Sequence, residues 1–130
     1  MIVNSNRFNF QEAVELALQN YMFDDVIPAM EESIDEVSKE AVRRLKQASK
    51  TEFKGTGKYA GGWTREKEKK RLTVGAVVYN KKTPGLPHLL ENGHVKRNGG
   101  RYYGKEHILP VEKWATEEVV DRFYDKLEGV

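Results

Sequence analysis

Helical periodicity between Asn9 and Thr51 constrains the fold of this chain more than any other feature. Asn9 and Glu12 have the spacing of a capping box, which predicts the start of a helix. Asp24 and Asp25 interrupt the apolar pattern and can cap a second helix that continues to about Thr51. At 1.5 Å per residue this second helix measures roughly 40 Å, which is long for such a small chain. The sequence therefore predicts two N-terminal helices, the second one long.

Both predicted helices are amphipathic. Their apolar stripes consist of Phe10, Ala13, Val14, Ala17, Leu18 and Tyr21 in the first, and of Val26, Met30, Ile34, Val37, Ala41, Leu45 and Ala48 in the second. The chain has 130 residues, of which 38% are hydrophobic and 32% charged, so its core is expected to be small. A domain of this kind often completes its burial in an oligomer.

The period of the pattern changes after residue 52. Residues 53–62 contain four glycines and predict a loop that leads into a short strand around Trp63. Residues 66–71 form a charged turn in this interpretation. A strand with one fully buried face follows, because Leu72, Val74, Ala76 and Val78 alternate with Thr73, Gly75, Val77 and Tyr79.

The last third of the chain is predicted to form short elements and a closing helix. Pro87 to Glu91 has the composition of one helical turn that ends at Gly93. Residues 94–107 form a basic loop or hairpin, Ile108–Leu109 a short strand, and Val111–Glu128 the final helix. We therefore expect one domain over residues 1–130 with an α+β fold: two helices, a small, mostly antiparallel sheet and a C-terminal helix.

Charge is unevenly distributed, although the whole chain carries only +2. Residues 1–42 contain nine acids and two bases, whereas residues 43–71 contain eleven bases and three acids. Residues 81–107 add six bases against two acids. This polarity favours self-association through complementary patches, or contact with nucleic acid.

Several classes of function find little support in the sequence. The chain has no cysteine and no apolar run of the roughly 20 residues that cross a bilayer, and its N-terminus lacks the pattern of a signal peptide. We expect a soluble protein made in the cytoplasm, without cofactor or metal. His88, His94 and His107 lack the spacing of a zinc site, and Gly57-Lys58 is followed by Tyr59, which breaks the phosphate-loop pattern. No serine lies in a nucleophile elbow, so we expect no enzyme.

Two basic segments interleaved with aromatic residues, near 53–71 and 94–107, are the candidate functional regions and are predicted to be flexible loops. Such segments can bind a phosphate backbone and stack bases. They can also form a solvated rim, or become ordered only against a neighbouring subunit. The candidate contact residues are Lys67, Lys69, Lys70, Arg71, Lys96, Arg97, Arg101, Tyr102 and Tyr103.

Three stretches of sequence resemble a known family. They are TGKYAGGW (56–63), HLLENGHVKRNGG (88–100) and HILPVEKWA (107–115). They are similar to the head–tail joining, or tail-completion, proteins of tailed bacteriophages of the HK97 type. That family typically has a leucine pair, Glu and Gly before a variable basic loop, and a proline that opens the last helix. The matching positions here are Leu89, Leu90, Glu91, Gly93 and Pro110, while Asn92 stands where an aromatic residue is common.

The resemblance implies a structural, non-enzymatic role in the virion, after assembly in the host bacterial cytoplasm. Copies of such a minor tail or neck protein form a ring, with hexameric symmetry to match the tail tube, around the channel through which DNA leaves. Its expected partners are further copies of itself and the neighbouring neck and tail proteins, with non-specific DNA contact in the channel and no membrane. The motif turn of Leu89, Leu90, Glu91 and Gly93 is expected to position the basic loop. The alternative function is a nucleic-acid-binding module that uses the same basic and aromatic residues.

Overall fold

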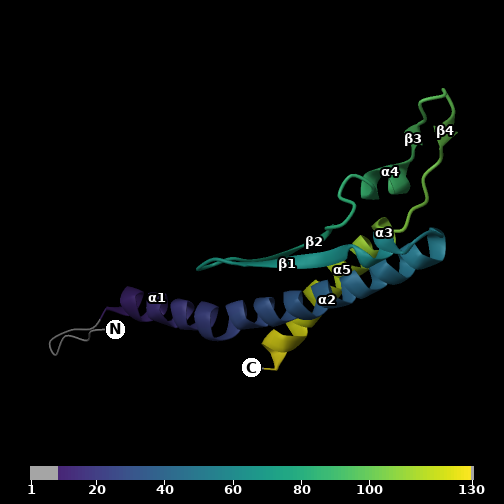
Figure 1. The fold of residues 1–130 in the computed structure, drawn as a ribbon. Helices are drawn as coiled ribbons and strands as arrows, with labels where there is room; N and C mark the ends of the chain where they lie inside the picture. Colours follow the sequence, from purple (N-terminus) through teal and green to yellow (C-terminus); the bar gives the residue numbers. More distant parts are fainter. Residues whose placement is uncertain (1–8, 130) are drawn as a thin grey trace.

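A continuous helical rod forms the spine of the protein. The computed structural model describes residues 9–129, and the rod comprises α1 (Phe10–Tyr21), a π-helical turn η1 (Met22–Val26) and α2 (Ile27–Glu52) (Figure 1). Its length is roughly 60 Å at 1.5 Å per residue. The predicted start is confirmed, because the Asn9 side-chain oxygen accepts hydrogen bonds from the backbone N–H groups of Gln11 and Glu12 at 2.9 and 3.3 Å.

The predicted break at Asp24 and Asp25 is wrong, because both residues lie inside the π-helical turn and neither caps α2. The cause is Pro28, which lies at the start of α2. A proline in a helix cannot donate to the carbonyl four residues earlier, and its ring clashes with that carbonyl. The wider π turn accommodates the proline without ending the rod, and the N–H of Ile27 donates to the carbonyl of Met22 instead.

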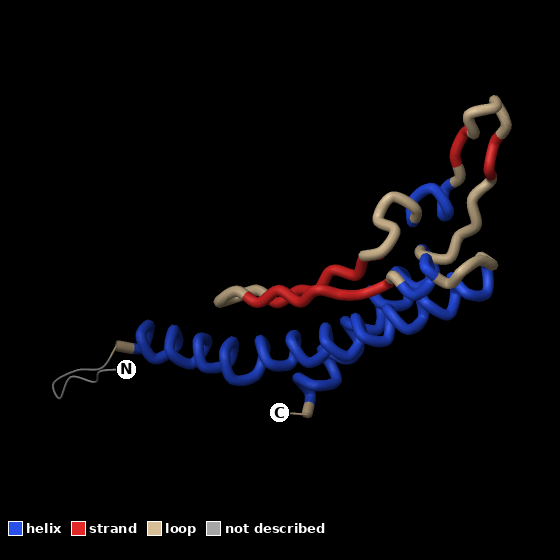
Figure 2. The backbone as a smooth tube through the Cα atoms, in the orientation of Figure 1, coloured by secondary structure: helices blue, strands red, loops and turns tan. Residues whose placement is uncertain are grey.

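An antiparallel hairpin of β1 (Trp63–Lys69) and β2 (Val74–Asn80) lies along α2 (Figure 2). Trp63 pairs with Asn80 at one end and Lys69 with Val74 at the tip. The strand predicted in this region is confirmed, but its inner face is only partly buried and Leu72 is exposed in the tip. The charged turn predicted over 66–71 is wrong for residues 66–69, which extend β1.

The segment near 53–71 that was predicted as a loop therefore forms helix or strand over most of its length. After the end of α2 the chain forms a short helix, α3 (Lys58–Gly61), and then enters β1 directly. The backbone N–H of Lys81 donates to the carbonyl of Gly62 at 2.8 Å, which ties this entry to the end of β2. Only the tip of the hairpin, residues 70–73, remains a turn, and the N–H of Lys70 closes it on the carbonyl of Thr73.

The C-terminal half contains α4 (Pro87–Asn92), a second hairpin of β3 (His94–Val95) and β4 (Arg101–Tyr102), and α5 (Leu109–Glu128). Gly93 ends α4 at the predicted position, but its φ of +82° and ψ of 173° lie outside the left-handed helical region expected of a glycine cap. The strand predicted at Ile108–Leu109 is wrong, since Leu109 already belongs to α5. Pro110 lies in the first turn of that helix, where its missing N–H has no acceptor to lose.

The core lies where α2, β1 and α5 meet. Ala41, Leu45, Trp63 and Val111 are its buried centre, and Val78 and Trp114 are among the side chains packed around it. Three serines of α2 are also buried, at positions 33, 38 and 49. The α+β class predicted from the sequence is confirmed. No helix among residues 9–129 is long and apolar enough to cross a membrane.

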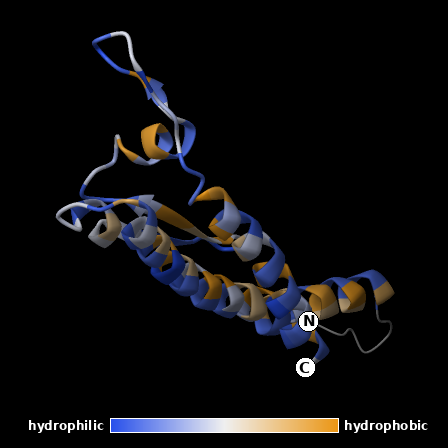
Figure 3. Cartoon of the chain, turned by 90° about the vertical axis from the view of Figure 1, so that its right-hand side faces the viewer, coloured by the Kyte–Doolittle hydropathy of each residue, from blue (hydrophilic) through white to orange (hydrophobic). Residues whose placement is uncertain are grey.

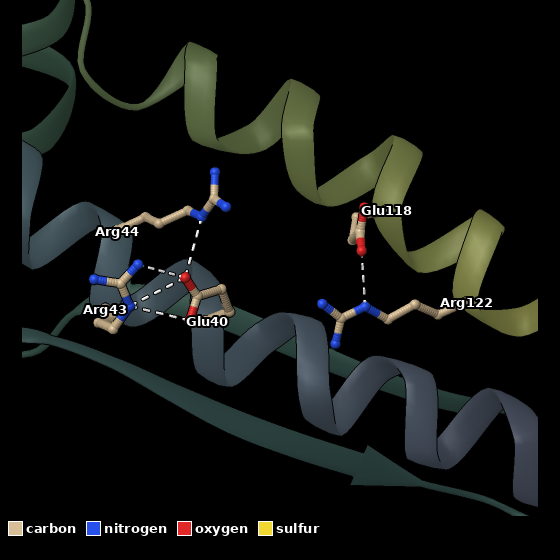
Figure 4. A network of polar contacts seen from close by, with 5 residues as sticks. All are labelled: Glu40, Arg43, Arg44, Glu118 and Arg122. Carbon is tan, nitrogen blue, oxygen red and sulfur yellow. Dashed lines mark hydrogen bonds and ion pairs between the residues drawn. The ribbon is translucent and has the colours of Figure 1, made fainter.

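Ion pairs line the contact between α2 and α5 (Figure 4). Glu40 binds Arg43 and Arg44 on its own helix, at 2.6 and 3.2 Å, and Arg122 binds Glu118 on α5 at 2.9 Å. The bond from Arg43 is the main cause that lowers the pKa of Glu40 to about 2. The guanidinium of Arg44 stacks on the ring of Trp114, 3.7 Å from its centroid.

Candidate assembly surfaces

The carboxylate of Glu91 joins the leucine–glutamate turn to the last helix. From α4 it accepts hydrogen bonds from the backbone N–H groups of His107, Ile108 and Leu109, at 2.7, 2.9 and 2.9 Å. The first N–H groups of a helix have no partner within it, and α5 has no side-chain cap of its own residues. Glu91 therefore caps α5 from a different element, and its charge suits the positive end of the helix.

Burial and hydrogen bonding act in opposite directions on the pKa of Glu91. Burial raises it, since the side chain is only 12% exposed, but the three backbone donors and His107 together lower the pKa below its ordinary value. The carboxylate is therefore held in its charged form. This contact fixes α4, and with it the segment that follows, against the start of α5.

Two glycines let the strands after α4 approach each other closely. A Cβ atom on Gly93 would collide with the carbonyl oxygen of Tyr102 and with the N–H of Gly104, and one on Gly104 would collide with the backbone of Glu91. Gly93 also needs its positive φ. The N–H of Lys105 donates to the carbonyl of Leu90 at 2.8 Å across the same junction. The base of the second hairpin is thus a tight, backbone-to-backbone contact.

A buried polar chain continues this junction into the core. His107 is 3% exposed, and its Nδ1 lies 2.8 Å from the carbonyl of Lys105 and 2.9 Å from Glu91. Two acceptors beside Nδ1 assign the proton to that atom, so Nε2 accepts from the hydroxyl of Tyr59 at 2.6 Å. Burial, with the charge of Glu91 adding to it, raises the pKa of Tyr59 to about 12, which keeps this donor protonated. Because His107 is enclosed, this arrangement orients the junction rather than presenting a reactive group to solvent.

The second hairpin projects away from the body of the protein (Figures 1 and 2). We call residues 94–105 the arm. Its strands pair His94 with Tyr102 and Val95 with Arg101, and a turn at residues 96–100 closes it. The expected loop or hairpin is thus a hairpin.

Most of the predicted contact residues of the arm are exposed. Lys96, Arg97, Arg101 and Tyr103 face solvent, Tyr103 being 77% exposed, whereas the half-buried Tyr102 lies against the ring of His94. In the described part of the chain, no carboxylate forms an ion pair with a base of the arm.

The basic residues of the first hairpin are placed differently. Arg65 and Lys67 both bind Asp35 of α2, at 2.8 and 2.9 Å, and Lys69 binds Glu31 at 2.8 Å. The bonds from Lys67 and then Arg65 lower the pKa of Asp35. Two of the predicted contact residues, Lys67 and Lys69, are therefore engaged by acids of their own chain.

The tip of that hairpin also lies over the rod. Arg71 stacks on the ring of Phe23 in η1, with 5.8 Å between the guanidinium and the ring centroid. Lys70 is exposed beside it. Three of the four predicted contact residues in 67–71 thus contact α2 or η1.

The apolar stripe of α1 was predicted from the sequence, but its exposure to solvent was not. None of the residues of α1 is buried, and Val14, Leu18 and Tyr21 are 57%, 59% and 46% exposed. Figure 3 shows these apolar turns at the end of the rod that carries the N-terminus. Periodicity shows that a helix has an apolar face, but it does not show whether the partner of that face belongs to the same chain.

An open depression at the opposite end of the rod forms what we call the basic groove, with a volume of about 520 Å³. Phe53, Tyr59 and Leu86 are among its lining residues, together with three exposed lysines at positions 50, 54 and 58. Gly55 and Gly57, from the segment that partly resembles a phosphate loop, also line it. Their role here is to turn the chain from α2 into α3, with Gly57 at φ +84°.

The three histidines do not meet. His107 is enclosed in the junction, His94 lies in the arm and His88 is exposed on α4. Within residues 9–129, no group of three or more metal-binding side chains is placed to hold an ion. Comparison of the chain with known protein families, with curated proteins and with solved structures gives no significant match.

Proposed function

We propose that this chain is a structural component of the head–tail junction of a tailed bacteriophage, of the head–tail joining or tail-completion type. Copies assemble in the host cytoplasm into a ring, with six as the expected number, around the DNA channel of the virion. The ring meets the neighbouring neck and tail proteins, and the role requires no catalysis.

The observation that carries this proposal is the behaviour of the motif residues as one structural unit. Glu91, Gly93 and Pro110, which match the family pattern, come together where α4 caps α5 and the arm emerges. A rigid base that presents a basic, aromatic arm is suited to contact with a neighbouring subunit. The exposed stripe of α1, at the other end of the rod, gives a second surface, as a ring with unlike contact faces requires.

The test is deletion of the gene from the phage that encodes it, followed by electron microscopy of the lysate. We expect DNA-filled heads and separate tails that do not join, and complementation with the wild-type gene should restore whole particles. Mass spectrometry of purified wild-type virions should detect the chain. Normal yields of infectious particles from the deletion would overturn the proposal.

A nucleic-acid-binding module is the second candidate, and the ion-pair pattern of the arm favours it. The bases of the arm have no acidic partner among the described residues, so they are free to neutralise phosphates. A fluorescence titration with a DNA duplex at several salt concentrations tests it. Binding that weakens steeply with salt supports this candidate, and no binding at about 50 mM salt excludes it.

A further inference from the structure

We propose that α1 of one copy binds the basic groove of a second copy, so that opposite ends of the molecule meet head to tail. The inference rests on the proposed function and deepens it by naming the two contact surfaces. It is argued from exposure, charge and the length of the rod.

The face of α1 has the character of a binding surface. Val14, Leu18 and Tyr21 form an exposed apolar stripe on a helix that contributes no buried residue to its own chain. Contiguous exposed apolar surface of this kind marks sites of interaction. In a 130-residue protein with a small core, we expect such an exposed apolar helix face to be covered by a partner.

Charge restricts what that partner can be. Residues 10–26 contain four acids, Glu12, Glu15, Asp24 and Asp25, and no base. A surface that receives α1 must therefore be apolar in the middle and free of additional acids, since like charges brought together without water between them oppose association. A basic margin would add attraction.

Two other exposed apolar patches of the chain fail this condition. On the outer face of the first hairpin, Val77 and Tyr79 lie among Glu66 and Glu68 of β1. On α5, Val120 and Tyr124 are exposed on a helix that carries six acids and three bases. Both surfaces would place carboxylates against those of α1.

The basic groove meets the condition. Its lining combines aromatic and aliphatic side chains, from Phe53 and Leu86, with the exposed lysines at positions 50, 54 and 58. None of these lysines forms an ion pair with another described residue. An amphipathic helix that lays its apolar face into such a groove, with acids beside the lysines, is a common mode of recognition.

The length of the rod shows that the two surfaces belong to different molecules when they meet. The groove begins at the last turn of α2, and the apolar stripe of α1 lies roughly 45–55 Å from it along one continuous helix (Figure 1). The helix of a given chain cannot reach its own groove. Because each copy carries both surfaces, the contact repeats and leads to a ring or a filament.

Because the chain contains no cysteine, a cysteine introduced by mutation is its only site for thiol cross-linking. Leu18→Cys and Lys54→Cys are prepared as two separate full-length proteins, mixed, and treated with a short bismaleimide. We expect a cross-linked dimer that contains one copy of each variant, in at least about tenfold excess over the dimer from a matched mixture of Leu18→Cys with Val120→Cys. Equal yields in the two mixtures, or a predominance of Leu18–Leu18 dimers, would overturn the inference.

Complementary variants provide a second readout. Val14→Asp with Leu18→Asp disables α1, and Lys54→Glu with Lys58→Glu disables the groove. Each variant alone should associate at least about tenfold more weakly than the wild type in sedimentation velocity. Mixed together they should form a 1:1 dimer that grows no further, because one intact α1 still meets one intact groove. Circular dichroism must show that both variants keep their helices.

Failure of this inference and failure of the proposed function give different results. The contact is contradicted if the wild-type chain does not associate at up to about millimolar concentration and the mixed Leu18→Cys and Lys54→Cys proteins do not cross-link. The deletion phenotype is unaffected by that result. Conversely, complete virions without the gene would overturn the phage assignment while the cross-link remained.

Discussion

The two hairpins of this protein carry similar numbers of basic residues and place them in opposite environments. The β1–β2 hairpin lies on α2, where Arg65, Lys67 and Lys69 meet Asp35 and Glu31. The β3–β4 arm projects from the body, and no acid of the described chain pairs with its bases. The first set of charges stabilises the fold and the second remains available to a partner.

Geometry explains why the first hairpin can be neutralised within the chain. Every second residue of a strand faces the same side, at intervals of about 6.7 Å, while acids four residues apart on a helix are about 6 Å apart along its axis. The bases of β1 at positions 65, 67 and 69 therefore match the acids of α2 at positions 31 and 35. A basic segment marks a binding surface only when no such match exists nearby.

The largest effect on stability is expected from removing Trp63, the residue that anchors the first hairpin to the core. Trp63 is 4% exposed and its indole N–H donates to Ser49 at 2.9 Å. Trp63→Ala should lower the free energy of unfolding by about 3–5 kcal/mol, because it leaves a cavity and removes the indole donor of the buried Ser49 oxygen. Urea denaturation followed by circular dichroism measures this value.

Tyr103→Ala in the arm is the matched control for the tryptophan. Its ring is 77% exposed, so removing it should change the free energy of unfolding by less than about 0.5 kcal/mol. A cost of less than about 1 kcal/mol for Trp63→Ala, or a similar cost for both variants, would contradict the view that one hairpin belongs to the core and the other does not.

Removing Glu91, which anchors the arm, should lower the free energy of unfolding somewhat less than removing Trp63. Glu91→Ala removes the acceptor of three backbone N–H groups at the start of α5, and we expect a loss of about 2–3 kcal/mol in the free energy of unfolding. Glu106→Ala, an exposed acid of the same segment, should cost less than about 0.5 kcal/mol. Equal costs would show that the carboxylate does not hold the arm.

The pH dependence of stability gives a smaller effect at the same residue. Hydrogen bonds to the charged carboxylate outweigh its burial, so the pKa of Glu91 is lower in the folded protein than in the unfolded chain. Its contribution is therefore complete above the ordinary glutamate pKa and is lost as the pH falls through the folded pKa. The difference in unfolding free energy between the wild type and Glu91→Gln should thus shrink between pH 7 and pH 3. A constant difference would contradict this assignment.

Much of the secondary structure could be predicted from the sequence, because it depends on local patterns. The Asn9 cap, the glycine end at Gly93 and the α+β class follow from periodicity and backbone preference. The errors have a common cause in contacts that are distant in the sequence. Residues 66–69 have the composition of a solvated turn, but they form a strand whose lysines bind acids of α2. Pro28 has the position of a helix start, but the preceding π turn keeps it within one continuous helix.

The candidate site was less predictable than the fold. The residues from Leu89 to Gly93 could be singled out from the sequence as a turn, but the role of Glu91 as the cap of a helix that begins 18 residues later depends on tertiary structure. The buried Ser49 gave no signal, since serine is ordinarily a surface residue. The stripe of α1 was visible, but its exposure was not, because an apolar helix face has the same sequence pattern whether it packs within a chain or between chains.

The smallest effect on stability is expected from removing the ion pairs between the first hairpin and α2. Lys67→Ala together with Lys69→Ala removes two partly exposed ion pairs to α2, and it should lower the Tm by about 2 °C at low ionic strength. In 1 M salt, where the screening length falls to about 3 Å, most of that difference should disappear. Differential scanning calorimetry at the two salt concentrations measures both values.

Lys96→Ala together with Arg97→Ala is the corresponding change in the arm. These two bases have no acid partner in the described chain, so their removal should leave the Tm unchanged at either salt concentration. A salt-sensitive loss of Tm from the arm pair, or none from the hairpin pair, would reverse the assignment of which charges stabilise the fold. If the expected pattern holds, any defect that the arm variant shows in assembly or in DNA binding must arise from a lost contact rather than from lost stability.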